Sequence, residues 1–204
     1  RTAVAVQPLR GRSLPSVTPP GSAFFEIALI QSEQPMASTL TNPFPRIHDD
    51  HAGLPDTERR ERVTEDVHRA IPFTETAEVE VEVYTPTRVV VAVDDREALH
   101  NHVGTFHAAL LSLLAETASG LVVALNVRDP AVPILRSMDV EFRRLATGRL
   151  TPEADLPEGE ATRIRDRPIG KIDVEVTVST AAGTAPIDAL MHWAWIPASK
   201  LSTE

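Results

Sequence analysis

The chain has 204 residues, of which 42% are hydrophobic, which suits one folded domain with a modest extension. Twenty Lys and Arg face 29 Asp and Glu, and the formal net charge of −9 argues against a general nucleic-acid binder, which needs clustered cations. The sequence contains no cysteine, which excludes disulfides, thiolate nucleophiles and thiolate metal ligands.

Prolines dominate the first quarter of the chain. Residues 1–55 hold eight of the 17 prolines, and proline lacks a backbone donor and disfavours helix before it. We therefore expect a Pro-rich, extended or disordered segment over residues 1–55. The chain begins with Arg1 and Met36 opens a plausible start, so residues 1–35 are interpreted as a mis-called upstream extension or a dispensable tail.

The early apolar segments do not suit a membrane. Residues 23–30 are interrupted by Glu26 and are far too short to cross a bilayer. No basic segment runs straight into a long apolar one, so we expect neither a signal peptide nor a membrane partner. A cytoplasmic location is the default expectation.

A folded domain is expected over residues 56–197, followed by a tail at 198–204. Residues 56–70 have an N-cap candidate in Asp56 and apolar positions spaced by four and three, which predicts a short amphipathic helix. Residues 78–84 alternate strictly between Glu and apolar positions, which indicates a strand with one buried face. Residues 88–93 give a second strand, and together the two predict a hairpin.

Residues 106–125 are the most apolar segment of the chain. Ala and Leu dominate it, and apolar residues lie on nearly all sides, so this helix has to be surrounded by protein. Glu116, Ser112 and Ser119 are unsuitable for a membrane span.

Four further strands are expected near residues 137–145, 147–155, 171–180 and 186–196. A parallel sheet would need more helices between strands. We therefore predict an α+β fold in which a mostly antiparallel sheet of about six strands wraps around one central helix. Such a sheet covers only one side of the helix, so a second copy or another partner has to cover the rest.

The residues that can carry chemistry lie between the hairpin and the central helix. A carboxylate inside an apolar helix is expensive unless it is paired or functional, and desolvation would raise the pKa of Glu116 and make it a better base. The helix begins near His107 and Ala108, where free backbone N–H groups point toward the preceding loop. Free amides of this kind suit a developing oxyanion.

This segment resembles the hotdog-fold acyl-CoA thioesterases of the phenylacetic-acid-pathway type and their uncharacterised relatives. That family has an Asn, then His-Gly-Gly at the helix start, then an Asp or Glu two turns on. The positions that fall in this register are Asn101, His107, Ala108 and Glu116. The strand ending at residues 142–150 and the later pair over 172–196 are also similar, and the resemblance covers roughly residues 71–197.

The resemblance implies a role for each residue. The Ala108 N–H would polarise a thioester carbonyl, and Glu116 of the other subunit would activate water or attack the carbonyl directly. Asn101 and His107 would position the substrate or the water. The implied substrate is an acyl-CoA or acyl-carrier thioester, the implied assembly is a homodimer or homotetramer, and no metal or organic cofactor is used. Ala108 and Ala109 stand where the family often has two glycines, which narrows the approach to the amide.

The expected site also includes three substrate-binding residues: Gly104, Arg143 and Arg144. The two arginines are included because arginine forks suit the phosphates of CoA. A second cationic group lies before the next strand and consists of Arg163, Arg165, Arg167 and Lys171. For each cation the alternative is a solvated side chain that balances nearby acidic residues.

Simpler interpretations of the site stay open. Without the resemblance, Glu116 is more simply explained as a structural carboxylate across a dimer interface, whereas the resemblance favours catalysis. His107 is equally explained as a ring packed at a helix end, and Asn101 as a turn residue. His100 and His102, with His107, suggest a metal site, but an HxH loop without a nearby second carboxylate is a weak signal. His192 is most simply a satisfied core or interface histidine.

Two other functions compete with hydrolysis. Acyl-CoA hydration or dehydration needs an Asp and a His in a glycine-rich entry, and no such string occurs. A non-enzymatic acyl-CoA sensor or structural dimer stays open. A DNA-binding version is disfavoured because residues 56–70 supply only one short, acidic helix.

Overall fold

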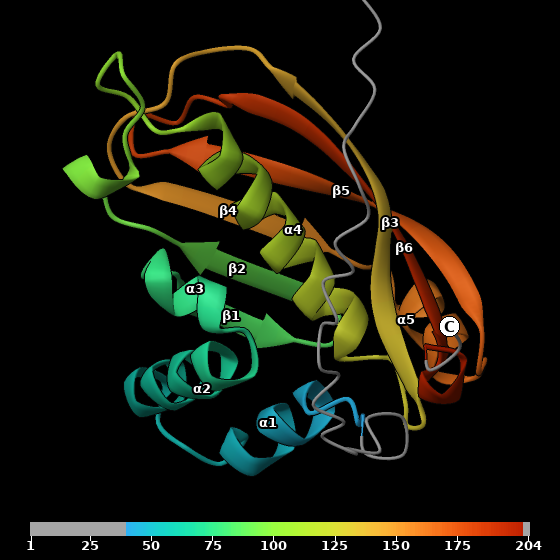
Figure 1. Cartoon of the computed structure of the whole chain (residues 1–204). Coiled ribbons are helices and arrows are strands. Elements are labelled where there is room, and N and C mark those ends of the chain that lie inside the picture. Colours follow the sequence, from blue (N-terminus) through green and yellow to red (C-terminus); the bar gives the residue numbers. More distant parts are fainter. Residues whose placement is uncertain (1–39, 202–204) are drawn as a thin grey trace, which may run out of the picture. The chain divides into compact units, whose positions relative to one another are not determined.

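The computed structural model describes residues 40–201 (Figure 1). Its helices are α1 (Phe44–His51), α2 (Asp56–Ala70), α3 (Pro72–Thr76), α4 (Ala108–Ala124) and α5 (Glu158–Arg165), with short 3-10 turns η1 (Glu97–Leu99) and η2 (Ala198–Lys200). Its strands are β1 (Glu80–Thr85), β2 (Arg88–Ala92), β3 (Ala131–Phe142), β4 (Leu150–Asp155), β5 (Gly170–Thr180) and β6 (Ile187–Pro197). Within this part of the chain no helix combines the length and hydrophobicity of a membrane span.

The six strands form one antiparallel sheet in the order β1-β2-β4-β5-β6-β3. The sheet curves around α4, which crosses its concave side (Figure 1). Alternate residues of β5 are buried while their neighbours are exposed, as a strand with one covered face requires. This is the hotdog arrangement, and the predicted α+β fold is confirmed.

The hydrophobic core lies between the sheet and α4. Leu114 and Leu121 of the helix are fully buried, as are Leu150, Met191 and Trp195 of the sheet. Complete burial of an aliphatic side chain is worth about 1.5–3 kcal/mol, so this layer is the main source of stability.

Strand β3 begins six residues earlier than the sequence predicted. Pro133 lies inside it, opposite Trp195 of β6, and a proline within an apolar run argues against a central strand. The strand tolerates Pro133 because β3 stands at the edge of the sheet, where one row of backbone groups needs no partner.

Three helices, α1, α3 and α5, were not expected from the sequence. In α1 and α3 a proline occupies the first turn, where a backbone N–H has no acceptor within the helix and its absence loses no hydrogen bond. A proline-rich sequence is therefore compatible with these helices. The described residues 40–55 are thus partly helical, whereas an extended segment was expected; residues 1–39 lie outside the described part. The segment before β5 that carries Arg163 forms α5, and the N-cap residue of α2 is Pro55 instead of the expected Asp56.

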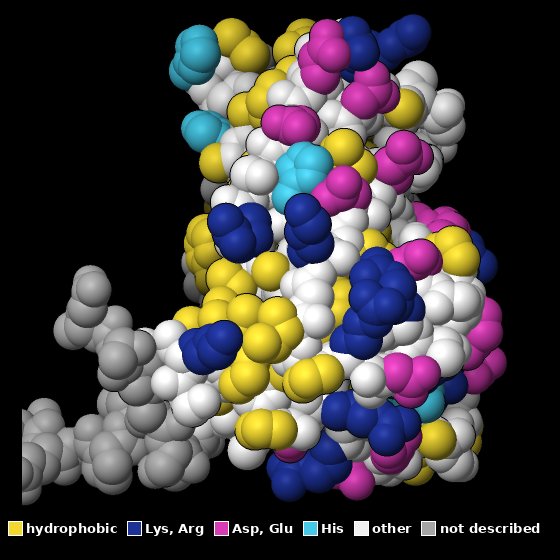
Figure 2. All heavy atoms as spheres, turned by 90° about the vertical axis from the view of Figure 1, so that its right-hand side faces the viewer, with side chains coloured by type: hydrophobic (Ala, Val, Ile, Leu, Met, Phe, Trp, Pro, Cys, Tyr) yellow, Lys and Arg dark blue, Asp and Glu magenta, His cyan; other side chains and the backbone are white. Residues whose placement is uncertain are grey.

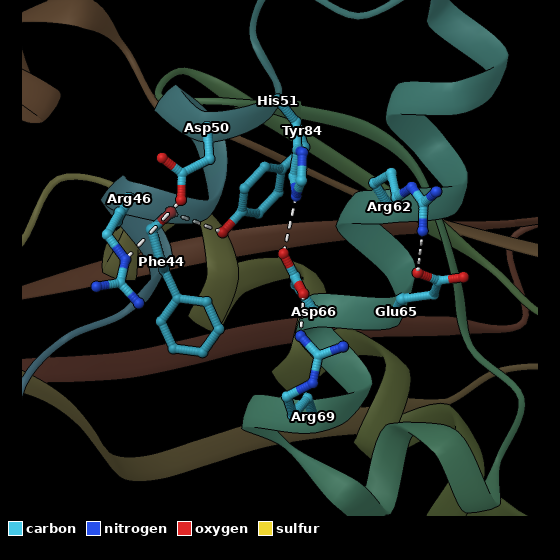
Figure 3. Close-up of polar contacts among 9 residues, drawn as sticks. All are labelled: Phe44, Arg46, Asp50, His51, Arg62, Glu65, Asp66, Arg69 and Tyr84. Carbon is cyan, nitrogen blue, oxygen red and sulfur yellow. Dashed lines mark hydrogen bonds and ion pairs between the residues drawn. The ribbon is translucent and has the colours of Figure 1, made fainter.

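Polar contacts attach α1 to the domain (Figure 3). His51 Nε2 lies 2.8 Å from Oδ2 of Asp66 in α2, and the Tyr84 hydroxyl donates to the Phe44 carbonyl at 3.2 Å. Just before α1, the buried side-chain amide of Asn42 donates to the carbonyls of Ala124 (2.7 Å) and Val127 (2.6 Å). Asn42 therefore ties the segment before α1 to carbonyls at and just beyond the C-terminal end of α4.

The two edges of the sheet differ in what covers them. At the β1 edge, the Val81 N–H donates to Oγ1 of Thr64 at 2.9 Å, and His68 Nε2 lies 2.8 Å from the Val79 carbonyl, so α2 covers the edge. At the other edge, β3 pairs only with β6 along its 12 residues, among the parts of the chain that are described. Hydrophobic side chains, with Lys and Arg beside them, gather on this side of the molecule (Figure 2).

Candidate functional site

The N-terminal end of α4 presents one free amide. His107 is the N-cap residue, and the Ala109 N–H donates to its Nδ1 at 3.0 Å, which requires that Nδ1 carry no proton. The Ala108 N–H contacts no acceptor within residues 40–201, and Ala108 is exposed. The expected helix start is confirmed, and its one uncapped donor points outward at the positive end of the helix dipole.

Asn101 shapes the loop that leads into α4. Its amide nitrogen donates to Oγ1 of Thr105 (3.0 Å) and to the Phe106 carbonyl (3.2 Å), and its Oδ1 accepts from the Val103 N–H at 3.0 Å. Gly104 in the same loop has a φ of +76°, which favours glycine. The side chain of Asn101 is therefore engaged by its own loop, and Gly104 allows the tight turn.

Three loops meet beside this helix start. The Phe106 N–H donates to the Ala146 carbonyl at 3.0 Å, and the Gly148 N–H donates to the Asp95 carboxylate at 2.5 Å. The other oxygen of Asp95 lies 2.5 Å from His100 Nε2. These bonds lower the pKa of Asp95, with the Gly148 backbone bond as the largest cause and the His100 contact next. The loops form a fixed rim around the Ala108 amide.

The two arginines expected at the site lie on one arm of this rim. Arg143 donates to Asp188 at 2.7 Å and to Glu141 at 2.5 Å, so its charge is balanced on the protein surface. Arg144 is exposed, and within the described part of the chain its guanidinium makes no ion pair. Of the two, Arg144 is the better placed to attract an anionic group.

Glu116 lies in the middle of α4 and is half-buried. Burial raises the pKa of its carboxyl above the ordinary value, and its carboxylate has no hydrogen-bond or ion-pair partner among residues 40–201. A carboxyl with these surroundings resists ionisation and binds a proton more tightly than one in water.

The wall beside Glu116 is formed by Trp193 of β6. A Cβ added at Gly120 would lie 2.8 Å from the distal ring carbon of Trp193 and 3.8 Å from Oε1 of Glu116, so the indole and the carboxyl share one small space. The Trp193 N–H donates to Oγ of Ser119 at 3.0 Å. Sequence reasoning missed this group, although the Ser-Gly pair one turn after Glu116 leaves room for a large ring.

Glu116 and the Ala108 amide do not meet within one chain. Eight residues separate them, which is about 12 Å along a helix axis. The same α4 face that carries Glu116 is only partly covered, at positions spaced by three or four residues: Ala109, Ser112, Leu113, Glu116 and Gly120.

The histidines of the suggested metal site do not share one centre, and His102 is exposed. His100 is held by Asp95, His107 caps α4, and no group of three or more metal-ligating side chains occurs among the described residues. His192 is satisfied as expected, 2.7 Å from Asp173 and 3.0 Å from Asp139, but it lies on the outer face and not in the core. Its expected alternative place, at an interface, stays a prediction. Residues of β6 alternate between the two faces of the sheet, and His192 occupies one of the outward-facing positions.

Comparisons with known proteins place the chain in a family. Residues 59–196, more than half of the chain, match the family described as Domain of unknown function (DUF4442). The chain belongs to this family. No curated protein matches this DUF4442 sequence.

Solved structures share the DUF4442 protein's fold. A Pseudomonas aeruginosa protein of unknown function, described as a "Probable Thioesterase", is 23% identical, with a TM-score of 0.60 over 71% of this chain and 97% of that one. A thioesterase from Haemophilus influenzae is 13% identical, with a TM-score of 0.55 over 66% of this chain and 91% of that one. At these identities the likeness establishes the fold.

Proposed function

We propose that this DUF4442 protein hydrolyses acyl thioesters of the acyl-CoA type. The observation that carries the proposal is the pairing of two unusual groups on one helix: an uncapped, exposed amide at Ala108 and a half-buried, unpartnered carboxyl at Glu116. Thioester hydrolysis needs a donor for the developing oxyanion and a base for the attacking water. The thioesterases among the similar structures add support at the level of the fold.

The chemistry divides between the two groups. The Ala108 N–H donates to the thioester carbonyl oxygen and stabilises the charge that develops on it. Glu116, whose pKa is raised by burial, takes a proton from water as the water attacks the carbonyl carbon. The thiol then leaves with that proton. Direct attack by the carboxylate is the alternative route for the same residue.

The active site is completed by a second copy of the chain. Because about 12 Å of helix separates Ala108 from Glu116, one thioester cannot contact both in one subunit. The open edge of β3 gives the second copy a place to bind, since α2 already covers the opposite edge at β1. A homodimer paired through β3 would carry two equivalent sites, each with Glu116 from the partner. Arg144 at the rim and His107 Nε2 are the groups that we propose to hold CoA phosphate or water.

Thiol release from a panel of acyl-CoA thioesters tests the reaction. Glu116→Ala is expected to lower kcat/KM by about 10²–10⁴-fold, the share of a general base. Glu175→Ala, which removes an exposed carboxylate from β5, is the matched control and should keep parental turnover. A folded parent protein that releases thiol from no substrate would leave a non-enzymatic acyl-CoA-binding dimer in its place.

Ala108→Pro tests the amide and the shared site together. Proline suits the first position of a helix, and His107 before it already has the extended backbone (φ −67°, ψ 137°) that a following proline needs. The variant removes only the N–H, and kcat is expected to fall about 10²–10³-fold.

Mixing Ala108→Pro with Glu116→Ala subunits decides whether the site is shared. Half of randomly mixed dimers contain one subunit of each kind, and each such dimer holds one intact site, so about a quarter of parental activity should return. A site built within one subunit would stay inactive in the mixture.

A further inference from the structure

An apolar pocket of about 240 Å³ opens beside the N-terminal end of α4. One wall comes from α3 and the residue after it, the other from the segment around η1, and the floor from α4. Its lining residues include Phe73, Ala77, Ala98, Leu99, Leu110 and Leu113. His107 and Ala109, which flank the Ala108 amide in sequence, complete the lining, so the pocket adjoins the proposed oxyanion donor.

The interior suits an apolar group. Among residues 40–201, no Asp, Glu, Lys or Arg lines the pocket. Its two histidines are engaged, since His100 contacts Asp95 at 2.5 Å and His107 Nδ1 accepts from the Ala109 N–H at 3.0 Å. A ligand inside would therefore be bound by hydrophobic contact.

Arg96 connects the two walls of the pocket. Its guanidinium donates to the Thr76 carbonyl at 3.0 Å and pairs with Glu78 at 3.2 Å, which ties the end of α3 to the segment that leads into η1. Phe73 at the mouth leaves 63% of its surface exposed, although burying an aromatic side chain is favourable. The pocket is thus preformed and presents an uncovered ring at its entrance.

We propose that this pocket receives the acyl group of the thioester and selects compact acyl groups. The inference rests on the proposed hydrolysis and adds its substrate class. A cavity of about 150 Å³ accommodates benzene, so a pocket of about 240 Å³ takes one ring or an alkyl chain of similar bulk. A long fatty-acyl chain exceeds it, and the CoA part stays outside, near the rim.

Two substitutions change the pocket in opposite directions. Ala98→Leu adds bulk to an exposed wall position and narrows the pocket, whereas Phe73→Ala removes the ring at the mouth. Kinetics with acetyl-, hexanoyl-, benzoyl- and palmitoyl-CoA should show hexanoyl or benzoyl preferred in the parent. Ala98→Leu should lower kcat/KM for both about tenfold or more, a larger loss than for acetyl-CoA, because one methylene is worth about 10–200-fold in an apolar pocket. Phe73→Ala should weaken the discrimination against palmitoyl-CoA. Ala182→Leu, at an exposed turn position, is the matched control.

Binding of a non-hydrolysable thioether separates this inference from the proposed reaction. S-hexyl-CoA should bind the parent at least about tenfold more tightly than CoA in calorimetry, and Ala98→Leu should remove the difference. That result supports the pocket even if no thioester is hydrolysed. Hydrolysis with an acyl preference that Ala98→Leu and Phe73→Ala leave unchanged would overturn the pocket and keep the reaction. Equal affinity of the parent for S-hexyl-CoA and CoA would also overturn it.

Discussion

The indole N–H of Trp193 donates to Oγ of Ser119 at 3.0 Å, which fixes a ring from β6 against α4 within one turn of Glu116. Ser119 in turn donates to the Ala115 carbonyl at 2.8 Å, so the helix backbone anchors the contact. Gly120 makes room for the ring, because a Cβ at this position would lie 2.8 Å from it. The strand that neighbours the open edge is thereby connected to the helix that carries the candidate carboxyl.

Gly120→Ala is expected to destabilise the protein. Alanine gains about 1 kcal/mol over glycine inside a helix, but the added methyl would contact the buried Trp193 ring at 2.8–2.9 Å. Overpacking of a core costs about 1–3 kcal/mol, and the rigid ring cannot turn away without losing its bond to Ser119. Urea unfolding should therefore give a lower midpoint for the variant.

Gly159→Ala is the matched control for that substitution. Gly159 lies in the first turn of α5, and a Cβ there meets nothing within 4 Å. This variant should be as stable as the parent or more stable. Equal midpoints for Gly120→Ala and Gly159→Ala would mean that Trp193 does not press on Gly120.

Local patterns in the sequence predict single helices and strands, whereas features that depend on the whole fold are not predicted. Strict alternation in β5 and the uniform apolarity of α4 predict the structure of these elements directly. The alternation in β1 predicts the strand itself, but a register shift between Val81 and Val83 interrupts its alternating burial. The first six residues of β3, which include Pro133, were not predicted, since a sequence does not say which strand stands at the edge and can accept a proline. The carboxyl and the helix start of the candidate site were predictable as local features. The indole beside Glu116 was not, because 77 residues separate Trp193 from it and only the fold brings them together.

The raised pKa of Glu116 predicts how stability changes with pH. The folded state binds this proton more tightly than the unfolded state, whose carboxyl titrates near the ordinary value of 4.5. Stability contributed by this group is therefore highest below that value and falls as the pH rises through the folded-state pKa. Glu116→Gln removes the cost of the buried charge. In urea unfolding from about pH 4 to pH 8, the variant should gain on the parent as the pH rises; a constant gap would contradict the expectation.

His192 should titrate above the ordinary histidine pKa of 6.5. The hydrogen bond to Asp139 of β3 is the largest cause and the bond to Asp173 of β5 the next, and both stabilise the protonated ring. The charged histidine thus links three strands, and its contribution is full below pH 6.5 and is lost as the pH rises through the folded-state pKa. NMR titration of the ring should give a lower pKa in Asp139→Asn, and in Asp173→Asn as well. An unchanged pKa in both variants would show that neither carboxylate holds the ring in solution.

Trp193→Phe should lower the pKa of Glu116 without removing the carboxyl. Phenylalanine is smaller than the indole and has no N–H for Ser119, so water gains access to the space that the carboxyl and the ring now share. If Glu116 is the base, kcat/KM falls in acid as this carboxyl is protonated, and the acid limb of the profile should move to lower pH in the variant. Trp195→Phe is the matched control, because Trp195 is also buried in β6 but packs on Gly170 and donates to the Arg167 carbonyl at 2.7 Å. The same shift in both variants would indicate a general loosening of the core. A shift in Trp193→Phe alone would show that the Trp193 ring is what excludes water from the Glu116 carboxyl.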